Sequence, residues 1–451
     1  MIRRAVVITP ICAPHDAISA AAADNFALLS ARPATTATML TGEDGRGLGA
    51  TIVQGVDQLL AAPAFREADL LLYHFGIYHP FHDALLIGNG HARQVVVFHN
   101  VTPAAHVAPR DRPLIERSLR QAHNIAHADE IWADSAFNAA DAEALGADPA
   151  RIHVVPLAVA RPAPRHLAQK PRERLEFLFL GRTVPSKGVH HLAAALVAAA
   201  PRLPAWHLTI AGNTAFSDAA YLAACRDTFA RAGLSAHVTC LDSPDDATLA
   251  ALYARAHILC IPSYHEGFCV PVIEGLRAGC IPLTTTAGNL PAITGGLGPL
   301  VPPGDEIALA DAITGLAGAL AADAPLPLGN TSLTIAAFDE RAADHVARFE
   351  PATIAALKHA RLDALLNSLP SNPHVRAPQA PPSASASAPT SPPAPPSRGL
   401  FHHTLAALRR PATPATAPAP PIAPPTTLTR AEQECFHRLA AAARRPPAAP
   451  P

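Results

Sequence analysis

The sequence predicts an α/β protein with two doubly wound parallel sheets in succession. Short apolar segments alternate with helical stretches through the first half of the chain, as in parallel sheets that are covered by helices. The same alternation starts again near residue 175 and continues to about residue 322. Between the two halves, residues 161–174 contain Pro162, Pro164 and Pro171, which is typical of an interdomain linker.

We assign residues 1–160 to an N-terminal domain. Five apolar segments predict its strands, near residues 5–9, 69–73, 94–98, 130–133 and 152–155. The loop after the first strand reads Thr9-Pro10-Ile11-Cys12-Ala13-Pro14-His15-Asp16. We expect Asp16 or Ser19 to cap the next helix, because short polar side chains accept hydrogen bonds from the first N–H groups of a helix.

Residues 175–330 form the second predicted domain, and its first strand ends in a basic turn. The buried-type strand Leu175–Leu180 is followed by Gly181-Arg182-Thr183-Val184-Pro185-Ser186-Lys187-Gly188. We expect Ser186 to cap the helix Val189–Ala199. A guanidinium, an ammonium and the N–H groups of a helix then meet at one strand end, and all three favour a diphosphate.

The same domain contains two glutamates around a second strand end. The apolar run Ile258–Ile261 leads into a turn with Glu266 and Gly267, and Glu274 lies on the helix expected next. A strand, a tight turn and a helix N-terminus often hold a phosphorylated ligand in α/β sheets. Carboxylates there accept hydrogen bonds from the hydroxyls of a sugar or ribose. The alternative is an ordinary strand–helix unit with a surface acid.

The C-terminal part changes character twice. Residues 331–368 are predicted to be helices that brace the fold, including Phe338–Phe349. Residues 369–451 are rich in Pro, Ala, Ser and Thr, which predicts an extended, disordered tail. Two segments in it, Leu400–Leu408 and Leu428–Ala443, have apolar residues at near-helical spacing. They are either docking elements for a partner or a membrane surface, or weakly helical tail.

Composition excludes several classes of protein. Lys and Arg (35) balance Asp and Glu (36), so no nucleic-acid partner is expected. Apolar runs stay below the roughly 18 residues of a membrane span, and we expect a cytoplasmic protein. The seven cysteines have no metal-ligand spacing: they are Cys12, Cys225, Cys240, Cys260, Cys269, Cys280 and Cys435. Cys240 and Cys260 lie in apolar strands and are expected to be buried, reduced thiols, and Cys269 is expected to be a small packing residue rather than a nucleophile.

These motifs resemble a known family. The turn from Gly181 to Gly188, the strand end Ala211-Gly212 and the pair Glu266/Glu274 are similar to the C-terminal half of retaining, metal-independent GT-B glycosyltransferases, called family 4 or group 1. The similarity is dense over about residues 175–315. Weaker similarity to bacterial polysaccharide-assembling members extends upstream, over 68–76, 94–103, 131–138 and 154–159.

The resemblance implies an activity and a set of site residues. The enzyme would move a hexose from GDP-mannose or a UDP-sugar to a glycan or lipid-linked acceptor, with retention, in cell-surface polysaccharide or lipopolysaccharide synthesis. Catalytic roles would fall to Glu266, Arg182, Lys187 and His99, and Glu274 would bind the ribose. The first domain would bind the acceptor, and no cofactor is implied. The residues that contact the nucleotide sugar would be Gly181, Arg182, Lys187, Gly212, Glu266, Gly267, Phe268, Cys269, Val270 and Glu274.

No metal is expected, because the chain contains no Asp-x-Asp sequence and the positive side chains would take the place of the ion. Two departures from the family pattern stand outside this core: the loop at 9–16 has no glycine, and Ala292 replaces a common acid.

The acceptor is less well encoded. Residues 110–127 carry four arginines against two acids, compatible either with lipid-linked phosphates and peripheral contact at the inner membrane or with a solvated helix. Other functions also fit a GT-B fold. A sugar-nucleotide epimerase normally lacks the combined Arg182/Lys187 and Glu266/Glu274 motifs, and a non-catalytic scaffold that uses the Pro-rich tail would bind a donor without turnover.

Overall fold

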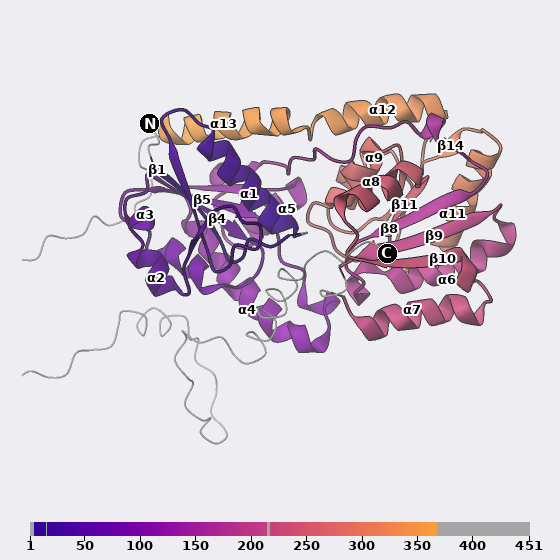
Figure 1. Ribbon diagram of the computed structural model, residues 1–451, viewed down its shortest axis with the longest axis horizontal. Helices are drawn as coiled ribbons and strands as arrows, with labels where there is room; N and C mark the ends of the chain where they lie inside the picture. The colour runs from indigo at the N-terminus through magenta and orange to yellow at the C-terminus, as the bar shows by residue number, and fades with distance from the viewer. Residues whose placement is uncertain (1–3, 15, 214–216, 368–451) are drawn as a thin grey trace, which may run out of the picture.

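The computed structural model describes residues 4–14, 16–213 and 217–367. They form two α/β domains that lie next to each other, each built on a parallel sheet, as predicted (Figure 1). The predicted tail 369–451, with its two helical segments, lies outside the described residues. No helix in the described ranges is long and apolar enough to cross a membrane.

The first domain contains a seven-stranded parallel sheet in the order β3-β2-β1-β4-β5-β6-β7. Its strands are β1 (Arg4–Thr9), β2 (Thr36–Thr41), β3 (Thr51–Ile52), β4 (Leu70–Phe75), β5 (Arg93–Phe98), β6 (Glu130–Ala133) and β7 (Ile152–Val154). The strands β2 and β3 were not predicted. β2 contains three threonines among its six residues instead of an apolar run, and β3 is a two-residue, exposed edge strand.

The helices of the first domain pack on both faces of this sheet. They are α1 (Ala17–Ser30), α2 (Val56–Ala61), α3 (Pro63–Arg66), α4 (Arg112–Ala122) and α5 (Ala136–Ala144). The predicted cap of α1 is confirmed for Asp16, whose Oδ2 accepts a hydrogen bond from the N–H of Ser19 at 2.7 Å.

The second domain contains a six-stranded parallel sheet in the order β10-β9-β8-β11-β12-β13. Its strands are β8 (Leu175–Leu180), β9 (Trp206–Gly212), β10 (Val238–Asp242), β11 (Ile258–Ile261), β12 (Ile281–Thr285) and β13 (Leu300–Val301). Its helices are α6 (Val189–Ala199), α7 (Ala219–Arg231), α8 (Asp246–Arg255), α9 (Val270–Arg277), α10 (Leu290–Ile293) and α11 (Glu306–Ala321). A small hairpin follows, β14 (Leu326–Pro327) with β15 (Ser332–Leu333).

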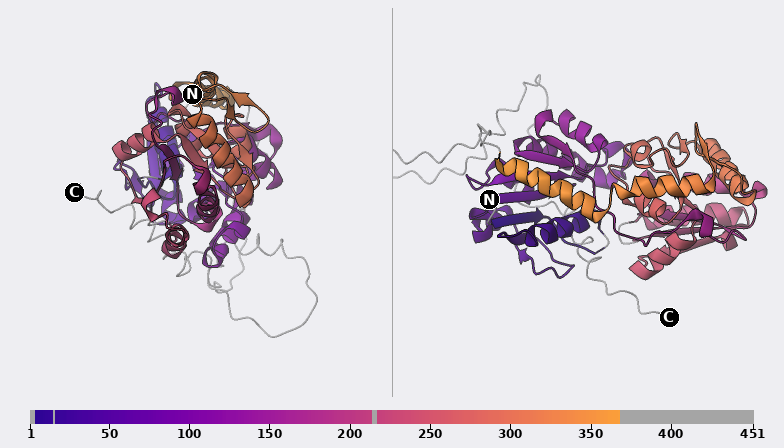
Figure 2. Two further views of the ribbon diagram at one scale, coloured as in Figure 1. Left: turned by 90° about the vertical axis from the view of Figure 1, so that its right-hand side faces the viewer. Right: turned by 90° about the horizontal axis from the view of Figure 1, so that it is seen from above.

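The last two helices join the domains. They run end to end along one side of the molecule, α12 (Ile335–Ala347) over the second domain and α13 (Pro351–Asn367) over the first (Figure 2). Leu362 and Leu365 of α13 are buried in the first domain's core beside Leu72 and Trp132. The chain thus returns to the domain in which it began, and this packing fixes the end of the described fold to the first sheet.

The turn after β8 differs from the prediction in one respect. Ser186 does not cap α6; it lies in a 3-10 turn, Pro185–Lys187, and the residue at the cap position is Gly188. Gly188 has φ +67°, in the left-handed region, and a Cβ there would lie 2.0 Å from the carbonyl oxygen of Pro262. A glycine is therefore required at this point, because the turn after β8 approaches the backbone that follows β11.

Packing of α13 on the first sheet leads to a prediction about stability. The Leu362→Ala variant should lose about 2–5 kcal/mol of unfolding free energy, because a fully buried leucine is replaced by a cavity. Urea denaturation measures this. The control is Ile307→Ala, an exposed position on α11, where the change should stay within about 0.5 kcal/mol. Equal effects for the two variants would contradict the packing described.

Candidate active site

The candidate site lies where strands of the second domain end. Gly181 follows β8, Gly212 ends β9, and the segment Ser263–Cys269, which we call the glutamate loop, connects β11 to α9. A Cβ on Gly212 would lie 2.0 Å from the carbonyl oxygen of Gly181. The two strand ends can therefore meet this closely only because residue 212 has no side chain.

Glu266 and Lys187 form the centre of the site. Lys187 Nζ lies 2.7 Å from Glu266 Oε1, and the hydroxyl of Ser263 donates to the same oxygen at 2.7 Å. Both charged side chains are largely buried, with exposed fractions of 19% and 12%. The structure therefore brings together two residues that are 79 positions apart in the sequence and that were predicted to act together.

The glutamate loop turns its carbonyl oxygens toward protein donors. The carbonyl of Glu266 accepts from the N–H of Asn289 at 2.9 Å, and that of Phe268 accepts from Asn289 Nδ2 at 3.1 Å. The carbonyl of Gly267 accepts from the hydroxyl of Ser135 at 2.6 Å. Within the described ranges, the N–H groups of residues 267–270 have no protein acceptor. These N–H groups, at the end of the loop and the start of α9, are therefore available to a ligand.

Arg182 is placed differently from Lys187. Its side chain is exposed, and in the described part of the chain it makes no hydrogen bond or ion pair. The backbone next to it is held, because the N–H of Thr183 donates to Ser217 Oγ at 2.8 Å. The structure thus puts Arg182 at the rim of the strand ends and does not bring it into contact with Glu266.

Glu274 lies on α9 and is bound by a residue that the sequence did not indicate. Its Oε2 accepts a hydrogen bond from the hydroxyl of Tyr253, on α8, at 2.7 Å. Burial raises the pKa of the Glu274 carboxyl above its ordinary value of 4.5, and the bond from Tyr253 opposes this rise. Tyr253 is buried, so its hydrogen bond fixes the position of the Glu274 carboxyl.

Cys269 ends the glutamate loop and occupies the cap position of α9. Its backbone has φ +76°, which is uncommon for a residue with a side chain. Burial raises the pKa of its thiol well above the ordinary value, so the thiol stays protonated. The neighbouring Phe268 packs edge-on against Phe349 at the start of the segment that leads to α13.

His99 follows β5 in the first domain, and both of its ring nitrogens have protein partners. Nδ1 lies 2.7 Å from Asp134 Oδ2, and Nε2 lies 2.9 Å from His74 Nδ1. Asn25 extends this row of hydrogen bonds, with its Nδ2 3.2 Å from His74 Nε2. Burial and the nearby His99 lower the pKa of His74 well below its ordinary value, so His74 is neutral. Each of these three hydrogen bonds has one donor and one acceptor when both histidines carry a proton on Nδ1. His99 is thus held inside the first domain.

Sequence reasoning missed the residues that support the predicted ones. Tyr253, Ser135, Asp134 and Asn289 all contact site residues, but each lies in an ordinary helix, strand end or turn sequence. The polar residues at strand ends were the available signal, since Asp134-Ser135 directly follows the apolar β6.

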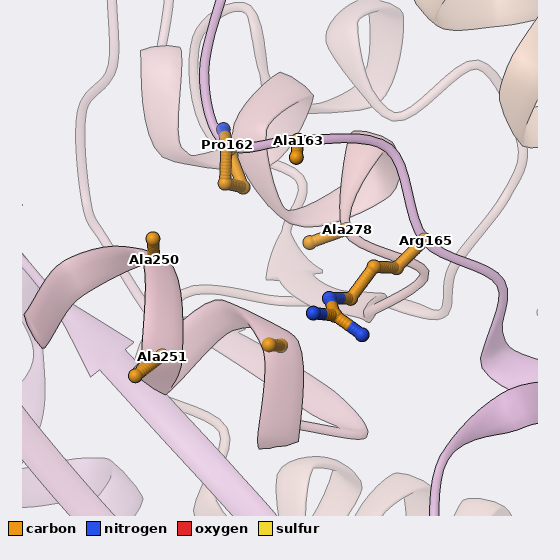
Figure 3. Close-up of a pocket in the computed structure, with 7 residues that line it drawn as sticks. Pro162, Ala163, Arg165, Ala250, Ala251 and Ala278 are labelled. Carbon is orange, nitrogen blue, oxygen red and sulfur yellow. The ribbon is translucent and has the colours of Figure 1, made fainter. Parts of the chain in front are cut away.

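A pocket lies beside the helices that carry Tyr253 and Glu274. It has a volume of about 160 Å³ and lies between the linker, α8 and the end of α9 (Figure 3). The residues that line it are Pro162, Ala163, Arg165, Ala250, Ala251, Ala254 and Ala278. The pocket contains none of the predicted donor-binding residues. In the described part of the chain, no cluster of three or more His, Cys, Asp or Glu side chains is arranged to hold a metal ion.

A family model identifies the second domain. Residues 174–318 match the family described as glycosyl transferases group 1. This stretch contains the basic turn and both glutamates, so the resemblance of the second domain to group 1 glycosyltransferases is confirmed. A search of curated proteins found no match to the chain.

Solved structures with a similar fold are GT-B glycosyltransferases. Sucrose-phosphate synthase from Thermosynechococcus elongatus is 19% identical, with a TM-score of 0.60 over 81% of this chain and 99% of that one. Anabaena HepE, solved with UDP and glucose, is 18% identical, with a TM-score of 0.61 over 80% and 100%. The lipopolysaccharide outer core galactosyltransferase WaaB is 15% identical, with a TM-score of 0.58 over 80% and 99%. These matches confirm the GT-B fold.

The environment of Glu274 gives a prediction about pH and stability. The raised pKa means that the folded protein holds this proton more tightly than the unfolded chain does. The stability of the wild type should therefore fall, relative to Glu274→Gln, as the pH rises from about 4.5 through the raised pKa. Thermal unfolding of both proteins across this range measures the difference.

The matched control is Glu340→Gln, which changes an exposed carboxyl on α12. It should follow the wild type at every pH. A Glu274→Gln variant that loses stability relative to the wild type as the pH rises would contradict the burial of this carboxyl.

Proposed function

We propose that this protein is a glycosyltransferase that moves a hexose from a nucleotide-diphosphate sugar to a glycan or lipid-linked acceptor, with retention of the anomeric configuration. The observation that carries the proposal is the glutamate loop. Its carbonyls are bound to the protein, the N–H groups of residues 267–270 have no acceptor among the described residues, and Lys187 lies against Glu266. The group 1 match over residues 174–318 supports the same reaction.

The donor diphosphate would bind to the basic side of this loop. Lys187 supplies an ammonium, and the N–H groups at the start of α9 supply hydrogen-bond donors and the positive end of the helix dipole. Arg182, exposed at the rim, would reach the outer phosphate oxygens. Fixed positive charge at this point stabilises the diphosphate as it leaves and gathers negative charge.

Glu266 and Glu274 would bind the two sugars of the donor. Glu266 shares one oxygen between Lys187 and Ser263, which leaves its second oxygen for a hexose hydroxyl. Glu274, held by Tyr253, would accept from the ribose hydroxyls. Gly181, Gly212 and residues 267–270 would contribute backbone contacts. The reacting hexose would pass through a state with oxocarbenium character, and the acceptor hydroxyl would attack on the face that the nucleotide leaves.

His99 would shape the space for the donor sugar, and its ring nitrogens would not bond to the sugar. Both nitrogens are bonded to Asp134 and His74, so a new hydrogen bond to a ligand requires one of these to break. Its neighbour Asn100 lies against the glutamate loop, so the end of β5 does reach the site. We therefore assign His99 to the wall of the donor pocket and not to proton transfer.

The proposal extends to the nucleotide base of the donor and to the biosynthetic pathway. GDP-mannose and UDP-sugars both fit the residues described, and the HepE structures with UDP and UDP-glucose favour testing uridine donors first. Similarity to WaaB and WaaG favours cell-surface polysaccharide or lipopolysaccharide synthesis. The proposed place of this reaction is the cytoplasm, next to the inner membrane.

The arginines of residues 110–127 are less available to an acceptor than the sequence suggested. Arg117 lies over the ring of Tyr78, 3.7 Å from its centroid, and is bonded to that tyrosine's hydroxyl. Arg110 lies 3.7 Å from Asp218 of the second domain. Arg112 and Arg120 remain exposed on α4, so these two are the candidates for contact with acceptor phosphates.

Removal of the basic side chains tests the diphosphate assignment. Lys187→Ala should weaken nucleoside-diphosphate binding and kcat/KM by about 10- to 150-fold, because it removes a charge-assisted contact worth about 1.5–3 kcal/mol. Arg182→Ala should fall at the lower end of this range, since its exposed charge is screened by solvent. Thermal stabilisation by UDP, GDP and ADP measures the binding.

The control for both variants is Arg231→Ala, which removes an exposed cation at the end of α7. It should bind and react like the wild type. Wild-type affinity and turnover in both Lys187→Ala and Arg182→Ala would contradict the assignment of the diphosphate to these side chains. A wild type that binds nucleotide without transferring sugar would favour a binding protein.

A second prediction concerns metal ions. Transfer by the wild type should persist in excess EDTA, because Lys187, Arg182 and backbone N–H groups are proposed to neutralise the diphosphate. The assay compares initial rates with EDTA, with added Mg²⁺ and with added Mn²⁺. If activity disappears on chelation and returns with either ion, the proposed neutralisation is wrong.

A further inference from the structure

Gly267 of the glutamate loop lies directly against the first domain. It is not among the described residues with positive φ, so its backbone does not require a glycine. A Cβ at this position would instead lie 2.9 Å from Asn138 Oδ1 and 3.1 Å from the Cβ of Asn100. Both neighbours belong to the first domain. The contact between the domains is therefore what demands a residue without a side chain.

The two asparagines that face Gly267 are held in place. Asn100 Nδ2 donates to Asn138 Oδ1 at 2.9 Å and lies 2.7 Å from Asp141 Oδ2. Asn138 is fully buried, and its Nδ2 donates to the carbonyl of Phe98 at 3.3 Å. Neither side chain can move aside without breaking a buried hydrogen bond, so the surface presented to Gly267 is rigid.

Ser135 adds a directional contact to this surface. It follows β6 and caps α5, and its Oγ accepts from the N–H of Asn138 at 3.1 Å. The same hydroxyl donates to the carbonyl of Gly267 at 2.6 Å, across 132 residues of sequence. One hydroxyl thus connects the start of a first-domain helix to the loop of the second domain.

Two ring contacts flank this bond. Phe137 lies edge-on to His265, with ring centroids 5.6 Å apart. His106 stacks on Tyr264, with centroids 5.7 Å apart. Three residues of the glutamate loop, at 264, 265 and 267, therefore touch the first domain. Because Glu266 lies among them, its position depends on both domains.

We propose that Ser135, Asn138 and Asn100 form a platform that positions the glutamate loop, and that Ser135 is a positioning residue for sugar transfer. The inference rests on the proposed function and adds the part played by the first domain. When the domains are in contact, the Gly267 carbonyl is bound by Ser135, and this bond holds the neighbouring Glu266 in place for the donor hexose. When this bond is absent, Glu266 loses its alignment with the donor hexose.

The platform should matter more for turnover than for nucleotide binding. Lys187 and Arg182 belong entirely to the second domain, so a nucleoside diphosphate can bind them without the platform. Loss of the Ser135–Gly267 bond should therefore lower kcat by about 3- to 10-fold, as expected for one neutral hydrogen bond, and leave the Kd for UDP or GDP within about twofold of the wild type.

Three substitutions at Ser135 separate this role from helix capping. Ser135→Thr keeps both the cap and the donor to Gly267. Ser135→Ala loses both. Ser135→Gly loses the donor but keeps most of the capping, since glycine is a good residue at this position. We expect Thr to retain most of the wild-type kcat, and Ala and Gly to show the same reduced kcat, although Ala lowers the melting temperature more.

Several outcomes would overturn the inference. Wild-type kcat in both Ser135→Ala and Ser135→Gly would do so, and so would a defect in Ala without one in Gly, which would indicate capping alone. A Thr variant as impaired as Ala would show that the hydroxyl is not the group that matters. In each case an active wild type would leave the proposed function standing.

A second measurement does not depend on activity. Gly267→Ala should separate the loop from the platform, so adding Ser135→Gly to it should lower the melting temperature by less than Ser135→Gly does in the wild type, through the small loss of capping alone. Thermal unfolding of the wild type, both single variants and the double variant gives this result directly. Fully additive effects of the two substitutions would contradict the contact.

Discussion

The direction of the backbone in the glutamate loop is the constraint on which the rest of the site depends. Three successive carbonyls, at 266, 267 and 268, are bound by Asn289 and Ser135. A peptide unit whose carbonyl is fixed on one side presents its N–H on the other. The N–H groups of residues 267–269 are therefore fixed in direction without any ligand to orient them, which is the preorganisation that favours binding of an anion.

Close approach of backbones makes this arrangement possible. A Cβ at Gly188, Gly212 or Gly288 would lie between 2.0 and 2.4 Å from a carbonyl oxygen of a neighbouring segment. These glycines let the ends of β8, β9, β11 and β12 meet around one loop. The first domain closes the loop from the other side, and α13 ties the end of the chain to that domain. The site thus belongs to both sheets, although its charged residues come from one.

The sequence was sufficient for the parts that depend on local pattern. Apolar runs predicted β1, β4 to β7, β8 and β11, and the family motifs assigned Lys187 and Glu266 to one site, where the structure pairs them. It failed where tertiary contacts decide the outcome. The two-residue edge strand β3 has no pattern of its own, and the cap of α6 is Gly188 because Pro262 leaves room only for a glycine. Tyr253 and Ser135 look like ordinary helix residues until the fold brings them to Glu274 and Gly267.

The stereochemistry of the product tests the central claim most directly. Purified protein would be incubated with UDP- or GDP-hexose and a lipid-linked or simple glycoside acceptor, and the anomeric proton signal of the new linkage would be recorded by NMR. The proposed reaction predicts a new glycosidic bond with the same anomeric configuration as the donor. An inverted linkage would contradict the retaining mechanism, and the absence of any product across the donor panel would contradict the assignment as a transferase.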